Sequence, residues 1–127
     1  MTIAIGTDIV EIERIYQVYQ RQGEKLVNRV LTPSEQERFY SMINDDVRMA
    51  YLAKRWCAKE AVSKAMGTGI AKGLGFQDIE VTNSESGAPQ VILSKSAQIK
   101  LNALGAQKIL ISLSDERHYA IAFCQLV

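Results

Sequence analysis

The chain has few of the residues that mark secreted, thiolate-metal or membrane proteins. Its 127 residues include two cysteines, Cys57 and Cys124, and one histidine, His118. The cysteines lack metal-ligand spacing, so both are expected to be reduced thiols packed as small hydrophobic groups. No run reaches the roughly 18 apolar residues of a membrane span. Asp8 and Glu11 interrupt the first residues, which do not follow the pattern of a secretory signal. We therefore expect a cytoplasmic protein that spans no membrane.

A large excess of charge of either sign is also missing. The 15 basic and 14 acidic side chains leave a net charge of +1, so no field of the whole molecule attracts a nucleic acid. Hydrophobic residues make up 47% and charged residues 23%, which is an ordinary composition for a globular protein. At this length we expect a single domain, residues 1–127.

The pattern of apolar residues predicts a mixed fold. Strands are expected over residues 3–8, 79–82, 91–93, 108–114 and 118–127. The last two are expected to form an antiparallel hairpin. Helices are expected over residues 9–22, 47–66 and 94–104, with one more from the start signal Thr32-Pro33-Ser34-Glu35. The order of elements predicts an α+β fold in which an antiparallel sheet packs against helices.

The most informative segment is residues 56–64, which read W-x-x-K-E-x-x-x-K. On a helix that turns about 100° per residue, one narrow face holds Trp56, Glu60, Ser63, Lys64 and Gly67. An aromatic ring, a carboxylate, a hydroxyl and an ammonium group therefore share a stripe. A buried helix face would ordinarily have leucines there.

A second carboxylate, Asp8, is predicted at the end of the first strand. Two hard oxygen ligands, one from a strand end and one from a helix, suit a divalent metal ion that also holds phosphate. The spacing alone leaves another interpretation equally open. Glu60 can be a surface residue paired with Lys64, and Asp8 can cap the helix expected to begin near Ile9.

A neighbouring face of the same predicted helix has three cations, Arg48, Arg55 and Lys59, with no acid between them. Such a row repels itself unless an anion is present. It is therefore either a phosphate-binding surface or a solvated basic stripe.

These motifs together resemble those of the holo-acyl-carrier-protein synthases, the small bacterial type of 4′-phosphopantetheinyl transferase. That family combines a G-x-D strand end with a [FW]-x-x-K-E-x-x-x-K helix, which are here Gly6-Thr7-Asp8 and residues 56–64. The similarity covers essentially the whole chain in order. It continues at residues 31–35, 67–70, 76–80, 87–89 and 112–114. The chain contains no P-loop pattern.

One departure from the family pattern is Asp115. Many members have a histidine directly after the S-x-S of the penultimate strand, which is here Ser112-Leu113-Ser114. In this chain the position is Asp115, and His118 lies three residues further on, where an extended strand would point it to the opposite face. How the adenosine phosphate would be contacted therefore stays open.

The resemblance implies a 4′-phosphopantetheinyl transferase-like fold and an enzyme of fatty acid biosynthesis. It would transfer 4′-phosphopantetheine from coenzyme A to a serine of apo-acyl carrier protein. Asp8, Glu60 and Lys64 would be the catalytic residues. Asp8 and Glu60 would bind Mg²⁺, which bridges the pyrophosphate, and Lys64 would neutralise phosphoryl charge. Coenzyme A would be bound by Arg48, Arg55, Lys59, Ser63, Lys64, Gly67 and Asp115.

The resemblance also implies two kinds of protein partner. Arg14, Arg21 and Lys25 would dock an acidic helix of the carrier protein through charge complementarity. The family forms homotrimers with active sites shared between subunits, so that Asp8 and Glu60 come from different subunits. Two alternatives remain. One is another Mg²⁺-dependent nucleotide hydrolase, and the other is a non-catalytic module that binds an acidic helical partner through the same basic row.

Overall fold

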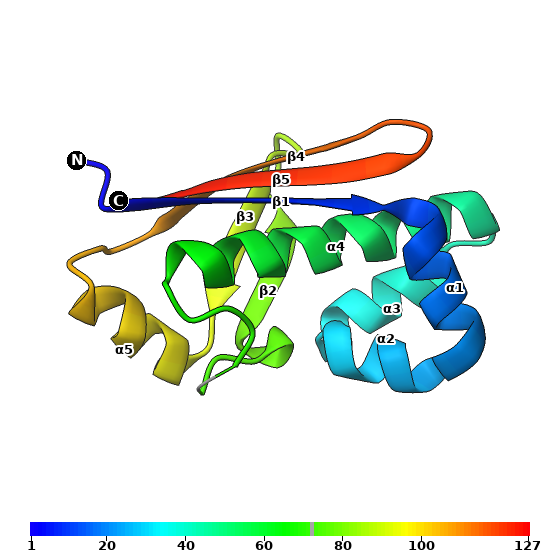
Figure 1. Ribbon diagram of the computed structural model, residues 1–127, viewed down its shortest axis with the longest axis horizontal. Helices are drawn as coiled ribbons and strands as arrows, with labels where there is room; N and C mark the ends of the chain where they lie inside the picture. Colours follow the sequence, from blue (N-terminus) through cyan, green and yellow to red (C-terminus); the bar gives the residue numbers. More distant parts are fainter. Residues whose placement is uncertain (72) are drawn as a thin grey trace.

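The structure is a computed structural model that describes residues 1–71 and 73–127 (Figure 1). Its strands are β1 (Ala4–Glu11), β2 (Ile79–Asn83), β3 (Pro89–Leu93), β4 (Ile109–Asp115) and β5 (Tyr119–Leu126). Its helices are α1 (Ile12–Gln22), α2 (Glu24–Val30), α3 (Pro33–Ser41), α4 (Asp45–Ala65), the 3₁₀ helix η1 (Phe76–Asp78) and α5 (Lys95–Ala103). The predicted α+β class, with antiparallel strands packed against helices, is confirmed.

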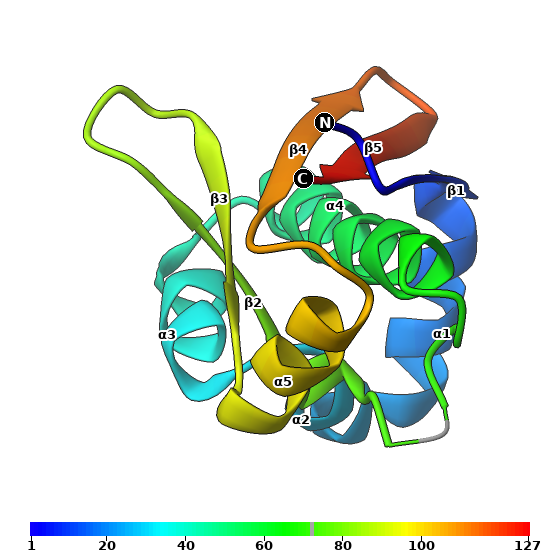
Figure 2. The same ribbon diagram turned by 90° about the vertical axis from the view of Figure 1, so that its left-hand side faces the viewer.

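The strands form two separate sheets, and α4 packs against both of them. The larger sheet has the order β1-β5-β4 and is antiparallel throughout, with β5 in the centre. The smaller sheet is the β2–β3 hairpin. Helix α4 runs along one face of the larger sheet, α1, α2 and α3 gather near one end of it, and α5 lies near the other end (Figures 1 and 2). In this arrangement one side of α4 faces β1 and another side faces β2.

The sequence of α4 explains both its length and its central place. Asn44 caps its first turn, because its side-chain oxygen accepts a hydrogen bond from the backbone N–H of Val47 at 3.0 Å. Small buried residues such as Ala53, Ala58 and Ala61 allow neighbouring elements to pack closely around it. No helix in the described part of the chain is long and apolar enough to cross a membrane.

Gly6 sets the distance between β1 and α4. A Cβ atom at this position would lie 2.1 Å from the backbone oxygen of Ala61 and 2.9 Å from the backbone nitrogen of Ala65. Only glycine therefore fits where the strand crosses the helix. Asp8 lies two residues further along β1 and so projects from the same face of the strand, toward α4.

Two boundaries differ from the sequence prediction. Strand β1 continues to Glu11 because it stays paired with β5 as far as Tyr119, so Asp8 lies within the strand and α1 begins only at Ile12. Gly23, with a φ of +55°, ends α1 and precedes α2, a helix that the sequence analysis did not predict. A single residue of positive φ is enough to turn the chain.

Candidate functional site

The two predicted metal-binding carboxylates meet between β1 and α4 of the same chain. Lys64, one helical turn after Glu60, donates from Nζ to Asp8 Oδ1 at 2.8 Å and to the backbone oxygen of Thr7 at 3.2 Å. Asp8 is close enough to Glu60 for its charge to contribute to a raised pKa of Glu60. The expectation that Asp8 and Glu60 come from different subunits is wrong, because β1 packs against its own α4.

The electrostatics of this cluster favour a cation. Burial is the main cause of the raised pKa of Glu60, and the charge of Asp8 is the second cause. The hydrogen bond to Asp8 raises the pKa of Lys64. Among residues 1–71 and 73–127, the Glu60 carboxylate has no hydrogen-bond partner. Of the two neighbouring carboxylates, Asp8 pairs with the one ammonium group and Glu60 does not, which leaves a negative site open to a further cation.

The donor set fits a hard divalent cation such as Mg²⁺. Both donors are hard carboxylate oxygens, which is the ligand type that Mg²⁺ prefers. The described residues contain no group of three or more His, Cys, Asp or Glu side chains that would form a closed cage. A site with few protein ligands suits Mg²⁺ because this ion usually keeps several waters and takes phosphate oxygens from its substrate.

Neither the thiol nor the hydroxyl group beside these carboxylates is available as a nucleophile. Cys57 is buried and donates from Sγ to the backbone oxygen of Asp8 at 3.0 Å. Burial and the nearby Asp8 raise the pKa of its thiol to about 12, so it stays protonated and is no nucleophile. Ser63 is also buried, and its hydroxyl donates to the backbone oxygen of Glu60 at 2.8 Å. The Ser63 hydroxyl is therefore not accessible for the predicted contact with coenzyme A.

The predicted row of three cations is not a single surface. Lys59 is fully buried, and its ammonium donates to Glu35 Oε1 and to the backbone oxygen of Val30, each at 2.6 Å. The expectation that Lys59 faces a phosphate is therefore wrong for its side chain, because α2 and α3 pack over this side of α4. Arg48 donates to the backbone oxygen of Met42 at 2.7 Å and lies over the ring of Phe39.

Arg55 lines a second site, on the side of α4 that faces β2. Arg55 is 7% exposed. Its Nη2 donates to the backbone oxygen of Val81 at 3.4 Å and to Asn83 Oδ1 at 3.3 Å. Its Nε has no hydrogen-bond partner, and among the described residues no carboxylate forms an ion pair with it. The guanidinium stacks on the ring of Tyr51, 4.4 Å from its centroid.

This second site is a hollow of about 510 Å³. Its lining includes Arg38, an exposed residue of α3 that the sequence analysis did not select. Nothing in its sequence context distinguished Arg38 from other exposed basic residues, since only packing brings α3 beside Arg55. Two guanidinium groups, one of them buried with no ion pair to a carboxylate among the described residues, suit a phosphate group. We call this hollow, lined in part by Arg38, Tyr51, Arg55 and Asn83, the arginine groove.

The remaining predicted ligands of coenzyme A lie at chain turns. Gly67, with a φ of +82°, lies two residues after the end of α4 and is exposed, and its backbone N–H donates to the backbone oxygen of Lys64 at 3.0 Å. Asp115 ends β4 and forms an ion pair with Lys54 of α4 at 3.1 Å.

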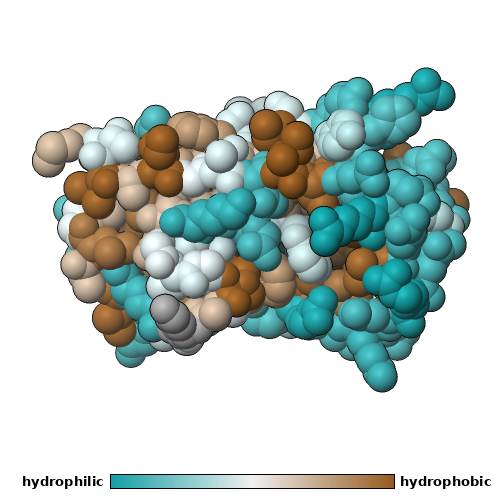
Figure 3. Space-filling model, in the orientation of Figure 1, coloured by the Kyte–Doolittle hydropathy of each residue, from teal (hydrophilic) through white to brown (hydrophobic). Residues whose placement is uncertain are grey.

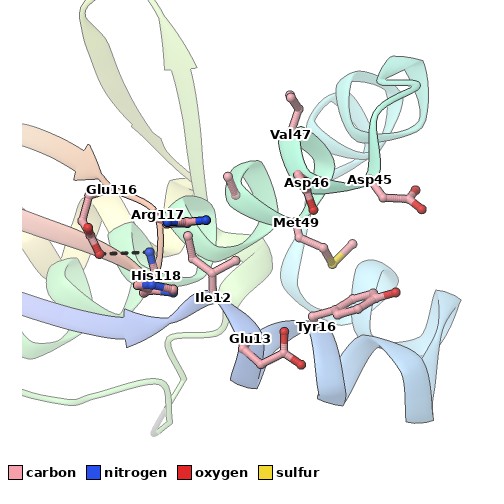
Figure 4. Close-up of a pocket in the computed structure, with 11 residues that line it drawn as sticks. Ile12, Glu13, Tyr16, Asp45, Asp46, Val47, Met49, Glu116, Arg117 and His118 are labelled. Atoms are coloured by element: carbon pink, nitrogen blue, oxygen red, sulfur yellow. Dashed lines mark hydrogen bonds between the residues drawn. The ribbon is translucent and has the colours of Figure 1, made fainter.

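His118 lies apart from the carboxylates, at a different hollow. That hollow measures about 710 Å³ and lies between the start of α1, the start of α4 and the β4–β5 turn (Figure 4). Glu116 accepts a hydrogen bond from the backbone N–H of His118 at 2.9 Å (Figure 4). Neither Asp8 nor Glu60 lines this hollow, so its size alone does not mark it as the centre of the chemistry.

Two helices share the basic residues predicted to contact a protein partner. Arg14 and Arg21 are exposed on α1, seven residues and about two turns apart, and therefore on one face. Lys25 is exposed but belongs to α2, because Gly23 breaks the helix before it. The two arginines therefore share one helix face and Lys25 lies on the next helix, and the docking role of all three residues stays a prediction.

The outer face of the larger sheet, turned away from α4, is apolar. Six large side chains on it are between 41% and 62% exposed: Ile5, Ile9, Leu110, Tyr119, Ile121 and Phe123. An antiparallel sheet face open to water is ordinarily polar. In Figure 3 the sheet is seen edge-on; the end of the molecule where α1 to α3 lie is mostly hydrophilic, whereas apolar patches are scattered over the rest of the view. We call these six residues the outer sheet face.

Comparison with known proteins gives one consistent result. Residues 4–124 match the 4′-phosphopantetheinyl transferase superfamily. The chain is 50% identical over 120 residues to the holo-[acyl-carrier-protein] synthase of Shewanella amazonensis, covering 94% of each chain. It is similar to the crystal structure of that enzyme from Neisseria meningitidis, with a TM-score of 0.92, 34% identity and coverage of 100% of this chain and 99% of the other. It is also similar to the Helicobacter pylori enzyme in complex with coenzyme A, with a TM-score of 0.82, 34% identity and coverage of 97% and 99%.

Proposed function

The chain belongs to the 4′-phosphopantetheinyl transferase superfamily, and we propose that it transfers 4′-phosphopantetheine from coenzyme A to a serine of apo-acyl carrier protein. The products are holo-acyl carrier protein and adenosine 3′,5′-bisphosphate. The observation that supports this most directly is the Asp8–Lys64–Glu60 cluster at the crossing of β1 and α4. It combines a cation-binding carboxylate pair with an exposed ammonium group, which is what phosphoryl transfer needs from a protein.

In this reaction the serine oxygen bonds to the phosphorus that bears pantetheine. The bond from that phosphorus to the bridging oxygen of the pyrophosphate breaks, adenosine 3′,5′-bisphosphate leaves, and the serine proton is released. Lys64, whose side chain is half exposed, can turn from Asp8 to the phosphates and stabilise negative charge there. Asp8 and Glu60 would hold Mg²⁺, which when bound supplies charge neutralisation at the pyrophosphate.

The coenzyme A site is shared between subunits in this proposal. Arg55 and Glu60 are five residues apart, which is about 140° around the helix. Arg55 accordingly contacts β2, whereas Glu60 and Lys64 face β1. One coenzyme A molecule that uses both groups must therefore lie between the Asp8–Glu60 cluster of one chain and the arginine groove of its neighbour. In this proposal the subunit boundary lies between Glu60 and Arg55, and no longer between Asp8 and Glu60.

The outer sheet face supplies the surface for such an assembly. Burial of large apolar side chains is the main favourable term in subunit association. A homotrimer in which these faces meet would remove the six apolar side chains from water and bring neighbouring subunits together around one axis. The three-stranded sheet then has α4 on its inner face and other subunits on its outer face.

Carrier-protein binding is expected to depend on Arg14 and Arg21. Reversing both charges, with Arg14→Glu and Arg21→Glu, should raise the KM for the carrier protein at least about tenfold, because an acidic partner helix then meets like charge. The KM for coenzyme A should stay unchanged. Steady-state rates with each substrate varied in turn measure both constants.

The matched control for charge is Lys95→Glu with Lys108→Glu, two exposed lysines on α5 and just before β4. It changes the net charge by the same amount and should leave both KM values near those of the wild type. Equal rises for the two substrates in the arginine variant would remove the docking assignment.

A product assay distinguishes the proposed transferase from a nucleotide hydrolase. The transferase releases adenosine 3′,5′-bisphosphate from coenzyme A only when apo-carrier protein is present, and in equal amount to the holo form. Release without carrier protein would favour the hydrolase. Carrier binding without any release would favour a non-catalytic binding module.

A further inference from the structure

A buried ion pair joins the two sides of the arginine groove. Glu35 of α3 is 2% exposed and Lys59 of α4 is fully buried. Glu35 Oε1 accepts from Lys59 Nζ at 2.6 Å and from the backbone N–H of Thr32 at 2.8 Å. Glu35 Oε2 accepts from the backbone N–H of Val81 at 2.7 Å. One side chain therefore connects α3, α4 and β2.

The bond to Val81 places this pair directly behind Arg55. The N–H of Val81 donates to Glu35, and the C=O of the same residue accepts from Arg55 Nη2 at 3.4 Å. Lys59 lies four residues, one helical turn, after Arg55 on α4. Both Glu35 and Val81 line the arginine groove. Any shift of β2 against α4 would thus move the polar atoms that hold the Arg55 guanidinium.

A contribution to folding stability does not by itself explain the buried Glu35–Lys59 ion pair. Removing two charges from water costs free energy, and well-packed apolar residues of similar volume often replace a buried ion pair without loss of stability. Apolar residues, however, would leave the N–H of Val81 unpaired. The hydrogen bonds of Glu35 supply a defined position for β2 that apolar packing does not.

We propose that Glu35 and Lys59 are positioning residues for coenzyme A, which hold Val81 and hence Arg55 in the geometry that binds the nucleotide part of the substrate. This rests on the proposed function, since it assigns coenzyme A to the arginine groove. Lys59 acts through Glu35 and does not touch the substrate.

The test is the double variant Glu35→Leu with Lys59→Met, which replaces the pair by apolar side chains of similar size. We expect it to fold and to raise the KM for coenzyme A about tenfold, the usual scale for a lost charge-assisted hydrogen bond. The kcat and the KM for the carrier protein should change less than about twofold, because the Asp8–Glu60 cluster and α1 are untouched. Glu35→Gln combined with Lys59→Met removes both charges, keeps one side-chain acceptor for the N–H of Val81, and should give a smaller rise. It serves the same test if the first double variant does not fold.

A matched control separates position from stability. Leu101→Ala removes a buried side chain of α5 that does not line the groove, so it should lower Tm while leaving the KM for coenzyme A unchanged. A wild-type KM for coenzyme A in the pair variants would overturn the proposal, as would equal rises for both substrates. Wild-type turnover in the same assay tests the proposed function separately. Calorimetric titration with coenzyme A reports binding to the groove even without turnover.

Discussion

Replacing either Asp8 or Glu60 by alanine is expected to reduce phosphopantetheine transfer by at least about 1,000-fold, the scale expected when electrostatic stabilisation of a phosphoryl group is lost. The two carboxylates form one negative site, in which burial and the charge of Asp8 raise the pKa of Glu60. With one carboxylate gone, the remaining one is neutralised by Lys64 alone, and the site no longer attracts a divalent cation. Rates should be measured at saturating coenzyme A and carrier protein over a series of Mg²⁺ concentrations.

The fold should survive these changes. Neither side chain belongs to the hydrophobic core, and Asp8→Asn and Glu60→Gln, which keep the shape, should lose activity to a similar degree. Glu13→Ala and Asp45→Ala, which remove exposed carboxylates from α1 and α4, are the matched controls and should retain wild-type rates. Circular dichroism and thermal melting check that each variant is folded. A wild-type rate in Asp8→Ala or in Glu60→Ala would remove the metal-site assignment.

Mixing two defective variants is expected to restore activity, provided that the defects lie in different halves of the shared site. In a trimer assembled at random from Glu60→Ala and Arg55→Ala chains, about a quarter of the sites combine an intact Glu60 with an intact Arg55 from the neighbour. Differently tagged chains can be co-expressed and mixed trimers purified through both tags. Activity at low coenzyme A concentration should then rise well above that of either variant alone.

The same experiment has an internal control. Asp8→Ala mixed with Glu60→Ala should show no recovery, because both carboxylates belong to the same half and every site keeps one defect. Phe123→Asp, which introduces a charge into the outer sheet face, should prevent assembly and abolish the recovery in the first mixture. Recovery in the Asp8–Glu60 mixture would instead show that the two carboxylates come from different subunits.

Local sequence signals predicted those features that depend on a few neighbouring residues. The start signal at Thr32-Pro33-Ser34-Glu35 corresponds to α3 with a capping box, and Asn44 caps α4. The W-x-x-K-E-x-x-x-K spacing correctly placed Glu60 and Lys64 on one side of a helix, where Asp8 meets them. The alternation of residues in the last two strands correctly indicated the β4–β5 hairpin.

Features that depend on distant packing were not predictable in this way. Helical spacing shows which side chains share a face, but not which element covers that face. Lys59 therefore looked like a neighbour of Arg55 on an open basic surface, whereas α2 and α3 bury it against Glu35. No sequence pattern indicated Arg38, because its place in the arginine groove depends on α3 lying beside α4. The end of β1 at Glu11 depends on the length of its partner β5, more than 100 residues away in the chain.

The intact mass of the carrier protein tests the central claim most directly. Purified chain, an apo-acyl carrier protein and coenzyme A are incubated with Mg²⁺ or with EDTA, and the carrier protein is then weighed by mass spectrometry. We predict a gain of one phosphopantetheine group with Mg²⁺ and no gain with EDTA. An unchanged mass with Mg²⁺, when the chain is folded and a reference synthase modifies the same carrier protein, would contradict the proposed transfer. An equal gain with EDTA would contradict the role of Asp8 and Glu60 as metal ligands.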